Sequence, residues 1–192
     1  MIVVAGGVHG DEPSGALLLP RLAADGFRAL GPLNPWGLER GRRWLADGGD
    51  LNRLLASRRC PEARRARELL AEEPPQLLLD LHEDRDSDRP YLIQVDPEGD
   101  LGSRVVAALS SRWAFHPTPR FGPVLGRRGV IRPRRWMLWL QRLSRRWSLT
   151  FYAWHRHGCP AYVVEVPSHW PLDERLEFHL SVCRAVRAAQ AA

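Results

Sequence analysis

The sequence predicts an α/β fold, with a mixed, mostly parallel sheet and helices on both of its faces. Short apolar runs that suit strands alternate along the chain with longer segments that suit helices, an order typical of such sheets. The 192 residues are 44% hydrophobic, and a chain of this length buries about 70% of its unfolded surface. We therefore expect one domain spanning residues 1–192, without internal repeats.

We expect four strands and four helices from the patterns of apolar residues. Four apolar runs predict strands: Ile2 to Ala5, Leu77 to Leu81, Tyr91 to Val95 and Ala161 to Val166. Four longer segments predict helices: Pro13 to Ala24, Pro61 to Glu72, Leu101 to Trp113 and Leu172 to Ala188. The glycine- and proline-rich pieces Gly31 to Pro35 and His116 to Pro133 predict active-site loops rather than linkers.

The first predicted strand leads directly into a potential metal site. It delivers His9 and Glu12, an imidazole and a carboxylate three residues apart. A catalytic zinc takes three protein ligands from such groups and keeps a fourth position for water. The second apolar run ends on His82, and neighbouring strands of one sheet open into the same crevice. We therefore predict that His9, Glu12 and His82 bind one Zn²⁺.

Further polar segments complete a recognisable pattern. They are Asn34-Pro35-Trp36-Gly37, Arg43, Asp50-Leu51-Asn52-Arg53 and Glu165 within an apolar run. With them the chain resembles the zinc metallocarboxypeptidases, the carboxypeptidase A-like hydrolases. Their signature is HxxE, NPxG, a separate Arg, DxNR, a His that closes a strand, and a Glu near the C-terminus. The resemblance extends from Val3 to about Pro167, and its elements occur in the family's order.

The resemblance implies a role for each ligand and for the base. His9, Glu12 and His82 would hold the zinc, and Glu165 would be the general base that activates the zinc-bound water. Chemistry agrees, because zinc lowers the pKa of its water and a nearby carboxylate can remove the proton. Asp80 shares a strand face with His82 and could orient that ligand or bind an arginine.

The resemblance also implies substrate contacts. Arg43 would polarise the scissile carbonyl, and we choose it over its arginine neighbours because its spacing to Asp50 fits the murein-peptide amidase branch. Asn52 and Arg53 would grip the substrate's carboxylate, for which the planar guanidinium is suited. The family often uses a mobile tyrosine near the base, and we expect Tyr152 in this place.

The implied function is a zinc-dependent hydrolase that cleaves an amide bond next to a free carboxylate, as a carboxypeptidase or peptide amidase. The alternative is an N-acyl-amino-acid deacylase of the succinylglutamate desuccinylase/aspartoacylase type. The expected substrate is accordingly a small acidic peptide or an acyl-amino acid. Because the chain begins almost at the strand that carries the zinc motif, the resemblance also implies a sheet trimmed at the N-terminus.

Composition indicates the compartment of the protein and the charge of the substrates that it would attract. The three cysteines, Cys60, Cys159 and Cys183, are scattered and form no CxxC motif, which favours reduced thiols and a cytoplasmic location. No apolar run approaches the length of a membrane span. The formal net charge is +6 and the sequence contains no lysine, so every cationic side chain except histidine is arginine. A positive field would steer acidic substrates to the protein.

The segment Arg127 to Trp147 has the pattern of a basic amphipathic helix. Its apolar side is formed by Trp136, Trp139, Leu140, Leu143 and Trp147, with arginines largely opposite. Such a helix is compatible with a membrane surface or nucleic acid. We expect instead that it packs through its Trp and Leu side and roofs the active site. Nucleic-acid binding is thus not the expected function.

Overall fold

The computed structural model describes residues 1–96 and 98–191. A six-stranded sheet has the order β2-β1-β3-β8-β4-β7. Its strands are β1 (Ile2–Gly6), β2 (Arg28–Leu30), β3 (Leu77–Asp84), β4 (Tyr91–Gln94), β7 (Val130–Ile131) and β8 (Ala161–Pro167). The first four in this order run parallel, whereas β4 is antiparallel to β8 and parallel to β7. The predicted mixed, mostly parallel sheet is confirmed.

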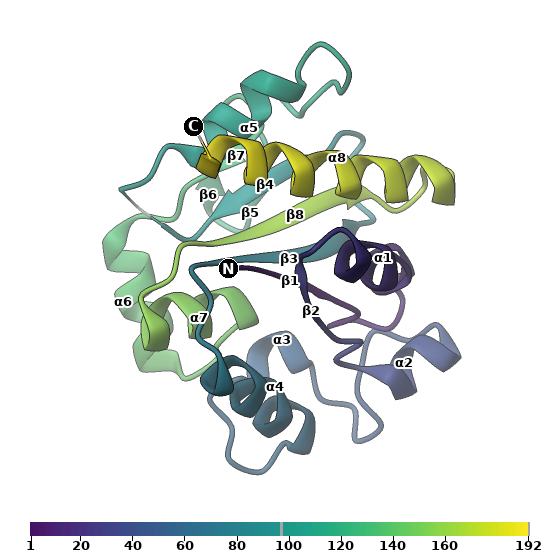
Figure 1. Cartoon of the computed structure of the whole chain (residues 1–192). Helices are drawn as coiled ribbons and strands as arrows, with labels where there is room; N and C mark the ends of the chain where they lie inside the picture. The colour runs from purple at the N-terminus through teal and green to yellow at the C-terminus, as the bar shows by residue number, and fades with distance from the viewer. Residues whose placement is uncertain (97, 192) are drawn as a thin grey trace.

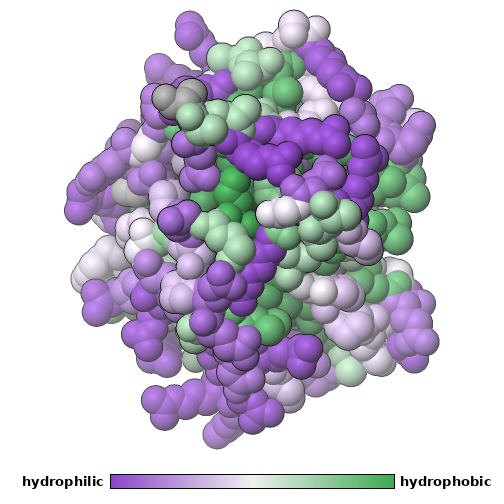
Figure 2. Space-filling view, viewed as in Figure 1, coloured by the Kyte–Doolittle hydropathy of each residue, from purple (hydrophilic) through white to green (hydrophobic). Residues whose placement is uncertain are grey.

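Helices cover both faces of this sheet (Figure 1). One face is covered by α1 (Pro13–Ala24), α5 (Leu101–Leu109) and α8 (Leu172–Ala191). The other is covered by α3 (Leu51–Leu54), α4 (Pro61–Glu72) and α7 (Leu149–His157). The remaining helices, α2 (Pro35–Arg40) and α6 (Arg135–Ser144), lie at the periphery. Figure 2 shows a largely hydrophilic surface where α8 crosses the molecule.

The alternation of side chains along the strands builds two separate cores. Val3 and Ala5 of β1 point into the core beneath α4 and α7, whereas Val4 points to the core beneath α1 and α8. In the same way Leu78 faces the first core and Leu79 the second. Strands buried on both faces consist of nearly continuous apolar residues, which explains why β1, β3 and β8 were visible in the sequence.

The strand register places the polar residues at one edge of the sheet. Gly6, the last residue of β1, pairs with Leu81 of β3, and His82 of β3 pairs with Glu165 of β8. These three parallel strands therefore end together, so the segments that follow them enclose one crevice. Their carboxyl ends lie toward the right in Figure 1.

The predicted helices Pro13 to Ala24 and Pro61 to Glu72 have the observed bounds. The predicted Leu101 to Trp113 helix ends earlier, at Leu109, and α8 extends to Ala191. Several short elements were not predicted because they contain few residues with a periodic pattern: β2, α2, α3, β7, and the hairpin of β5 (Arg120–Phe121) and β6 (Val124–Leu125), as well as α7.

The prediction for Arg127 to Trp147 was wrong in two respects. The helix covers only Arg135–Ser144, because Val130 and Ile131 form β7 beside β4 and Arg145 adopts a left-handed conformation that ends the helix. Four residues of the side that was expected to pack, Trp136, Trp139, Leu140 and Leu143, are also exposed, whereas Trp147 packs against the core and Leu138 is the buried residue of α6. Throughout the described ranges, no helix is long and apolar enough to cross a membrane.

Candidate active site

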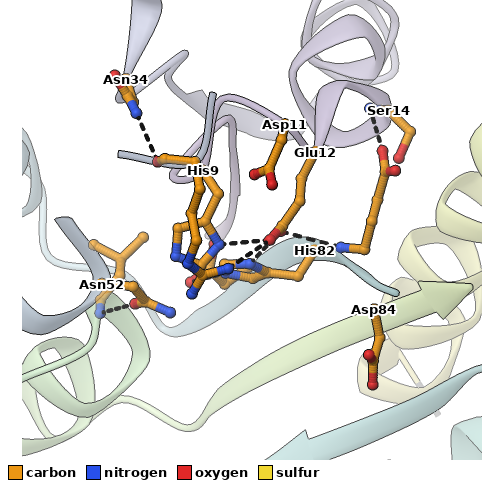
Figure 3. A network of polar contacts seen from close by, with 12 residues as sticks. His9, Asp11, Glu12, Ser14, Asn34, Asn52, His82 and Asp84 are labelled. Carbon is orange, nitrogen blue, oxygen red and sulfur yellow. Dashed lines mark hydrogen bonds and ion pairs between the residues drawn. The ribbon is translucent and has the colours of Figure 1, made fainter. Parts of the chain in front are cut away.

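Three side chains meet where β1 and β3 end. His9 lies in the turn after β1, Glu12 directly precedes α1, and His82 lies in β3 (Figure 3). His9 Nδ1 is 2.7 Å from Glu12 Oε1, and His82 Nδ1 is 2.7 Å from Glu12 Oε2. All three residues are buried, and one ligand atom of each lies within 4.8 Å of the others.

This donor set fits a zinc ion. Two imidazole nitrogens and a carboxylate are one of the ligand sets of catalytic zinc. The far nitrogen of each ring faces an acid: His9 Nε2 is 3.2 Å from Asp50 Oδ1, and His82 Nε2 is 3.1 Å from Asp80 Oδ2. The hydrogen bond of His9 with Asp50 favours the tautomer that leaves His9 Nδ1 free for a metal, whereas His82 Nε2 and Asp80 Oδ2 form no hydrogen bond among the described residues. Asp80 thus lies beside His82, and its orienting role stays a prediction.

The charges of these groups are strongly coupled. Burial would raise the pKa of Glu12, but His82 and His9 hold it well below its usual range. Burial would lower the pKa of His82, but Asp80 and Glu12 hold it well above its usual value. The pocket thus favours the ionised carboxylate of Glu12 despite its burial, which is the form that would bind a cation.

Glu165 projects into the same pocket from β8. It lies beside His82 on β3 and beside Tyr91 on β4, so both neighbouring strands fix its position. Burial raises the pKa of Glu165 to about 8, and the negative charges of Glu12, Asp84 and Asp80 add to this effect against the opposing influence of His82. A carboxylate with a raised pKa and an open side is suited to accept a proton.

Arg43 reaches the site from the loop after α2. Its guanidinium is 3.2 Å from Glu12 Oε1 and 3.3 Å from Asp50 Oδ2, and the side chain is 34% exposed. Asn34 holds this loop, because its side-chain amide donates hydrogen bonds to the backbone carbonyls of Arg43 and Trp44. Arg43 therefore connects Glu12 to the entrance of the pocket.

The NPxG motif has a structural explanation. Asn34 caps α2 by accepting a hydrogen bond from the backbone N–H of Gly37 at 2.9 Å. Gly37 also packs against Gly10 in the turn that carries His9, so closely that a Cβ on Gly10 would lie 2.0 Å from the carbonyl carbon of Gly37. Two glycines thus allow the Arg43 loop to approach the turn that carries His9.

Asn52 and Arg53 lie on the short helix α3, which Asp50 caps by accepting a hydrogen bond from the backbone of Asn52. The side-chain oxygen of Asn52 accepts from the backbone N–H of Leu149 at 3.0 Å, which ties α3 to α7. Both Asn52 and Arg53 line the pocket. In the part of the chain that the structure describes, Arg53 has no ion-pair partner.

The pocket has a volume of about 430 Å³ and receives contributions from seven segments of the chain. It is lined by His9, Asp11, Glu12, Arg43, Asn52, Arg53, His82, Glu83, Asp84, Arg85, Asp86, Tyr91, Arg120, Phe121, Gly122 and Glu165. Seven of the eight residues predicted for the site are therefore brought together.

The exception is Tyr152. Its side chain is 9% exposed and lies in the core beneath α7, where its ring neighbours Trp147 and His157. The sequence could not place it, because α7 turns Tyr152 inward against the sheet. Tyr91 lines the pocket instead and donates a hydrogen bond to Asp84 Oδ2 at 2.6 Å.

Other pocket residues were also missed. Arg120 and Phe121 reach the pocket from the β5–β6 hairpin, and the predicted loop from His116 to Pro133 gave the only signal for them. Asp50 belongs to the DxNR motif, yet its contact with His9 depends on how the α3 loop folds back over the turn. Glu83 accepts hydrogen bonds from the Ser14 backbone and from Arg175, so its carboxylate is already engaged.

Behind the site, His179 of α8 is fully buried, and neither of its ring nitrogens has a hydrogen-bond partner among residues 1–96 and 98–191. Burial lowers the pKa of His179 to about 3, and the positive charges of His82 and Arg175 contribute. The unfolded chain, with an ordinary histidine pKa, then binds the proton more readily than the folded chain. Stability contributed by neutral His179 is lost as pH falls below about 6.5.

We therefore expect acid to destabilise the metal-free protein less when His179 is replaced. The free energy of unfolding of the wild type should fall by roughly 2 to 3 kcal/mol more than that of His179→Leu between pH 7 and pH 4.5. Urea unfolding at both pH values measures the difference. Parallel pH dependences of the two proteins would contradict a buried neutral His179.

Comparisons with known proteins bear on the fold. No family model and no curated protein matches the sequence. Among solved structures, a protein of Shewanella baltica assigned by prediction to the metallopeptidases superposes with a TM-score of 0.79 at 17% identity. The alignment covers 98% of this chain and 75% of that one.

Two further structures have named activities. The D,L-carboxypeptidase Csd4 of Helicobacter pylori matches with a TM-score of 0.70 at 18% identity, over 96% of this chain and 49% of that one. A metallo-carboxypeptidase of Burkholderia cenocepacia matches with a TM-score of 0.69 at 18% identity, over 100% of this chain and 57% of that one. This chain thus has the zinc-carboxypeptidase-like fold, and it spans about half the length of these two enzymes.

Proposed function

We propose that the protein is a zinc-dependent hydrolase that cleaves an amide bond next to a free carboxylate, as a carboxypeptidase or peptide amidase. The observation that carries the proposal is the convergence of His9, Glu12 and His82 within 4.8 Å, beside Glu165 and in a pocket with Arg43 and Arg53. The likeness to metallo-carboxypeptidases supports the fold on which this site is built.

The proposed roles follow from the chemistry of the side chains. His9, Glu12 and His82 would hold one zinc ion, which when bound supplies a Lewis acid for amide hydrolysis. Glu165 accepts the proton of the attacking water and returns it to the leaving amine. Its rigid position between β3 and β4 keeps the carboxylate oriented toward the ligands.

The arginines of the pocket bind the substrate in this proposal. Arg43 donates hydrogen bonds to the scissile carbonyl oxygen and stabilises the negative charge that develops there. Arg53 pairs with the free carboxylate, and Asn52 contributes its side-chain NH₂ because its oxygen is already bonded to Leu149. A small acidic peptide is the substrate that suits these contacts.

The metal assignment is tested with His9→Ala, Glu12→Gln and His82→Ala. We expect the purified wild type to contain about one zinc per chain and each variant to lose most of it, because two donors remain where a catalytic site needs three. Mass spectrometry of metals after dialysis measures the content. Asp86→Ala is the matched control, since this exposed acid lines the same pocket outside the ligand set and should retain zinc. Wild-type zinc in all three variants would refute the assignment.

We also propose that the protein works in the cytoplasm. Cys60, Cys159 and Cys183 are all free and buried, a state that a reducing compartment maintains. Burial raises the pKa of Cys159 to about 11 and of Cys183 to about 12, so both thiols stay protonated and unreactive.

A further inference from the structure

Positive charge is concentrated in one part of the chain. Residues 101–164 contain twelve arginines and neither aspartate nor glutamate, although the whole chain has a net charge of only +6. Eight of the twelve lie between positions 127 and 146: Arg127, Arg128, Arg132, Arg134, Arg135, Arg142, Arg145 and Arg146. All eight are exposed, and of these only Arg135 has an ion-pair partner among the described residues, Glu98.

Large apolar side chains are exposed among these arginines. On α6 the exposed fractions are 56% for Trp136, 57% for Trp139, 47% for Leu140 and 59% for Leu143. Leu138 alone anchors the helix in the core. An apolar face of this size on a helix at the margin of the molecule indicates a binding surface (Figure 1).

The β5–β6 hairpin extends this surface. Leu125 is 70% exposed and Phe121 is 44% exposed. Leu125 and Trp136 line one shallow cavity of about 760 Å³, so the hairpin and α6 form a continuous surface. Phe121, Leu140 and Arg53 line another cavity, of about 330 Å³, which connects the surface to the mouth of the active-site pocket. We call the six apolar residues and the arginines that line cavities with them the tryptophan-arginine surface; these arginines are Arg127, Arg132, Arg134, Arg135, Arg142 and Arg146.

We propose that the tryptophan-arginine surface binds anionic phospholipid membranes peripherally. Arginines attract the acidic headgroups, and the indole and leucine side chains enter the boundary between headgroups and acyl chains. Tryptophan suits this boundary because its ring is apolar with one polar N–H. The short α6 lies parallel to the membrane and needs no spanning segment.

The chemistry of the surface favours lipid over two other partners. Nucleic acid would pair with the arginines but would leave Leu125, Leu140 and Leu143 without an apolar environment. A second copy of the chain would bring one arginine-rich surface against another and would oppose like charges. An anionic membrane satisfies both the apolar and the cationic side chains.

The proposal is tested by sedimentation of the full chain with phospholipid vesicles. We expect retention on vesicles of phosphatidylcholine mixed with phosphatidylglycerol, and at least tenfold less on phosphatidylcholine alone. Retention should fall as ionic strength approaches about 1 M, where screening is nearly complete. Trp136→Ala/Trp139→Ala and Arg142→Glu/Arg146→Glu should each reduce binding at least tenfold.

Matched controls separate this surface from exposure and charge in general. Leu17→Ser removes an apolar side chain of α1 that is 57% exposed, and Arg64→Glu reverses an exposed charge on α4; both should bind as the wild type does. Unchanged circular dichroism shows that the variants fold.

The proposal fails if anionic vesicles retain no protein, if the tryptophan variant binds normally, or if the wild type prefers duplex DNA. It also fails if the wild type is a dimer that the tryptophan variant converts to monomers. Binding is measured without catalysis, so the result is independent of the proposed hydrolysis.

Discussion

Glu165→Gln is expected to lower the hydrolysis of a peptide with a free C-terminal carboxylate by about 10²- to 10⁴-fold while the zinc content stays unchanged. The amide keeps the shape of the side chain on β8 but cannot accept the proton of the attacking water. Glu165 is not one of the three converging ligand side chains, so the metal should stay bound. Turnover and metal content are measured on the same preparation.

A control variant and a second candidate for the base determine how this result is interpreted. Glu174→Gln changes an exposed acid at the start of α8 and should leave turnover intact. If Glu165→Gln is fully active, the base lies elsewhere. Glu83 would then be the next candidate, although its bonds to Ser14 and Arg175 argue against a free carboxylate.

Arg53→Ala is expected to cost roughly 2 to 4 kcal/mol in transition-state stabilisation, and only for substrates with a free carboxylate. Arg53 faces the pocket without an ion-pair partner in the described chain, so its charge is available to the substrate. The wild type should discriminate strongly against C-terminally amidated peptides, because a neutral group would leave the guanidinium unpaired. Values of kcat/KM for the free and amidated forms measure this loss.

Arg59→Ala, which removes an exposed arginine from the connection between α3 and α4, is the control and should behave as the wild type does. Equal cleavage of amidated and free peptides by the wild type would eliminate the carboxylate clamp. The same assay should include N-acetyl- and N-succinyl-amino acids. Preference for these acyl compounds would replace the peptidase proposal with a deacylase.

The sequence was sufficient to predict the longer strands of the sheet and the meeting of the potential ligands. β1, β3 and β8 are buried on both faces, so their apolar residues form runs that stand out in the sequence. His9 and Glu12 follow one run, and His82 and Glu165 lie near the ends of two others. Parallel strands end at a common edge, and this rule alone brings the four side chains together.

Contacts between distant segments required the tertiary structure. The sequence predicted Tyr152 for the pocket and gave no signal for Tyr91, but α7 packs Tyr152 into the core and β4 places Tyr91 beside Glu165. The contact of Asp50 with His9 spans 41 residues and depends on how the loop before α3 folds back over the turn that carries His9. Neither the positions of the two tyrosines nor the contact of Asp50 with His9 is indicated by the sequence around these residues.

The segment around α6 shows most clearly that local sequence cannot decide which side chains are exposed. Its sequence determined that a helix with an apolar side and a basic side would form, since periodicity is a local property. Whether the apolar side is covered depends on which other elements occupy the neighbouring space. Here α7 and α4 already fill the core on that face of the sheet, so the Trp and Leu side of α6 remains at the surface. The sequence thus specified the amphipathic pattern, and only the packing of the whole chain decided that it faces outward.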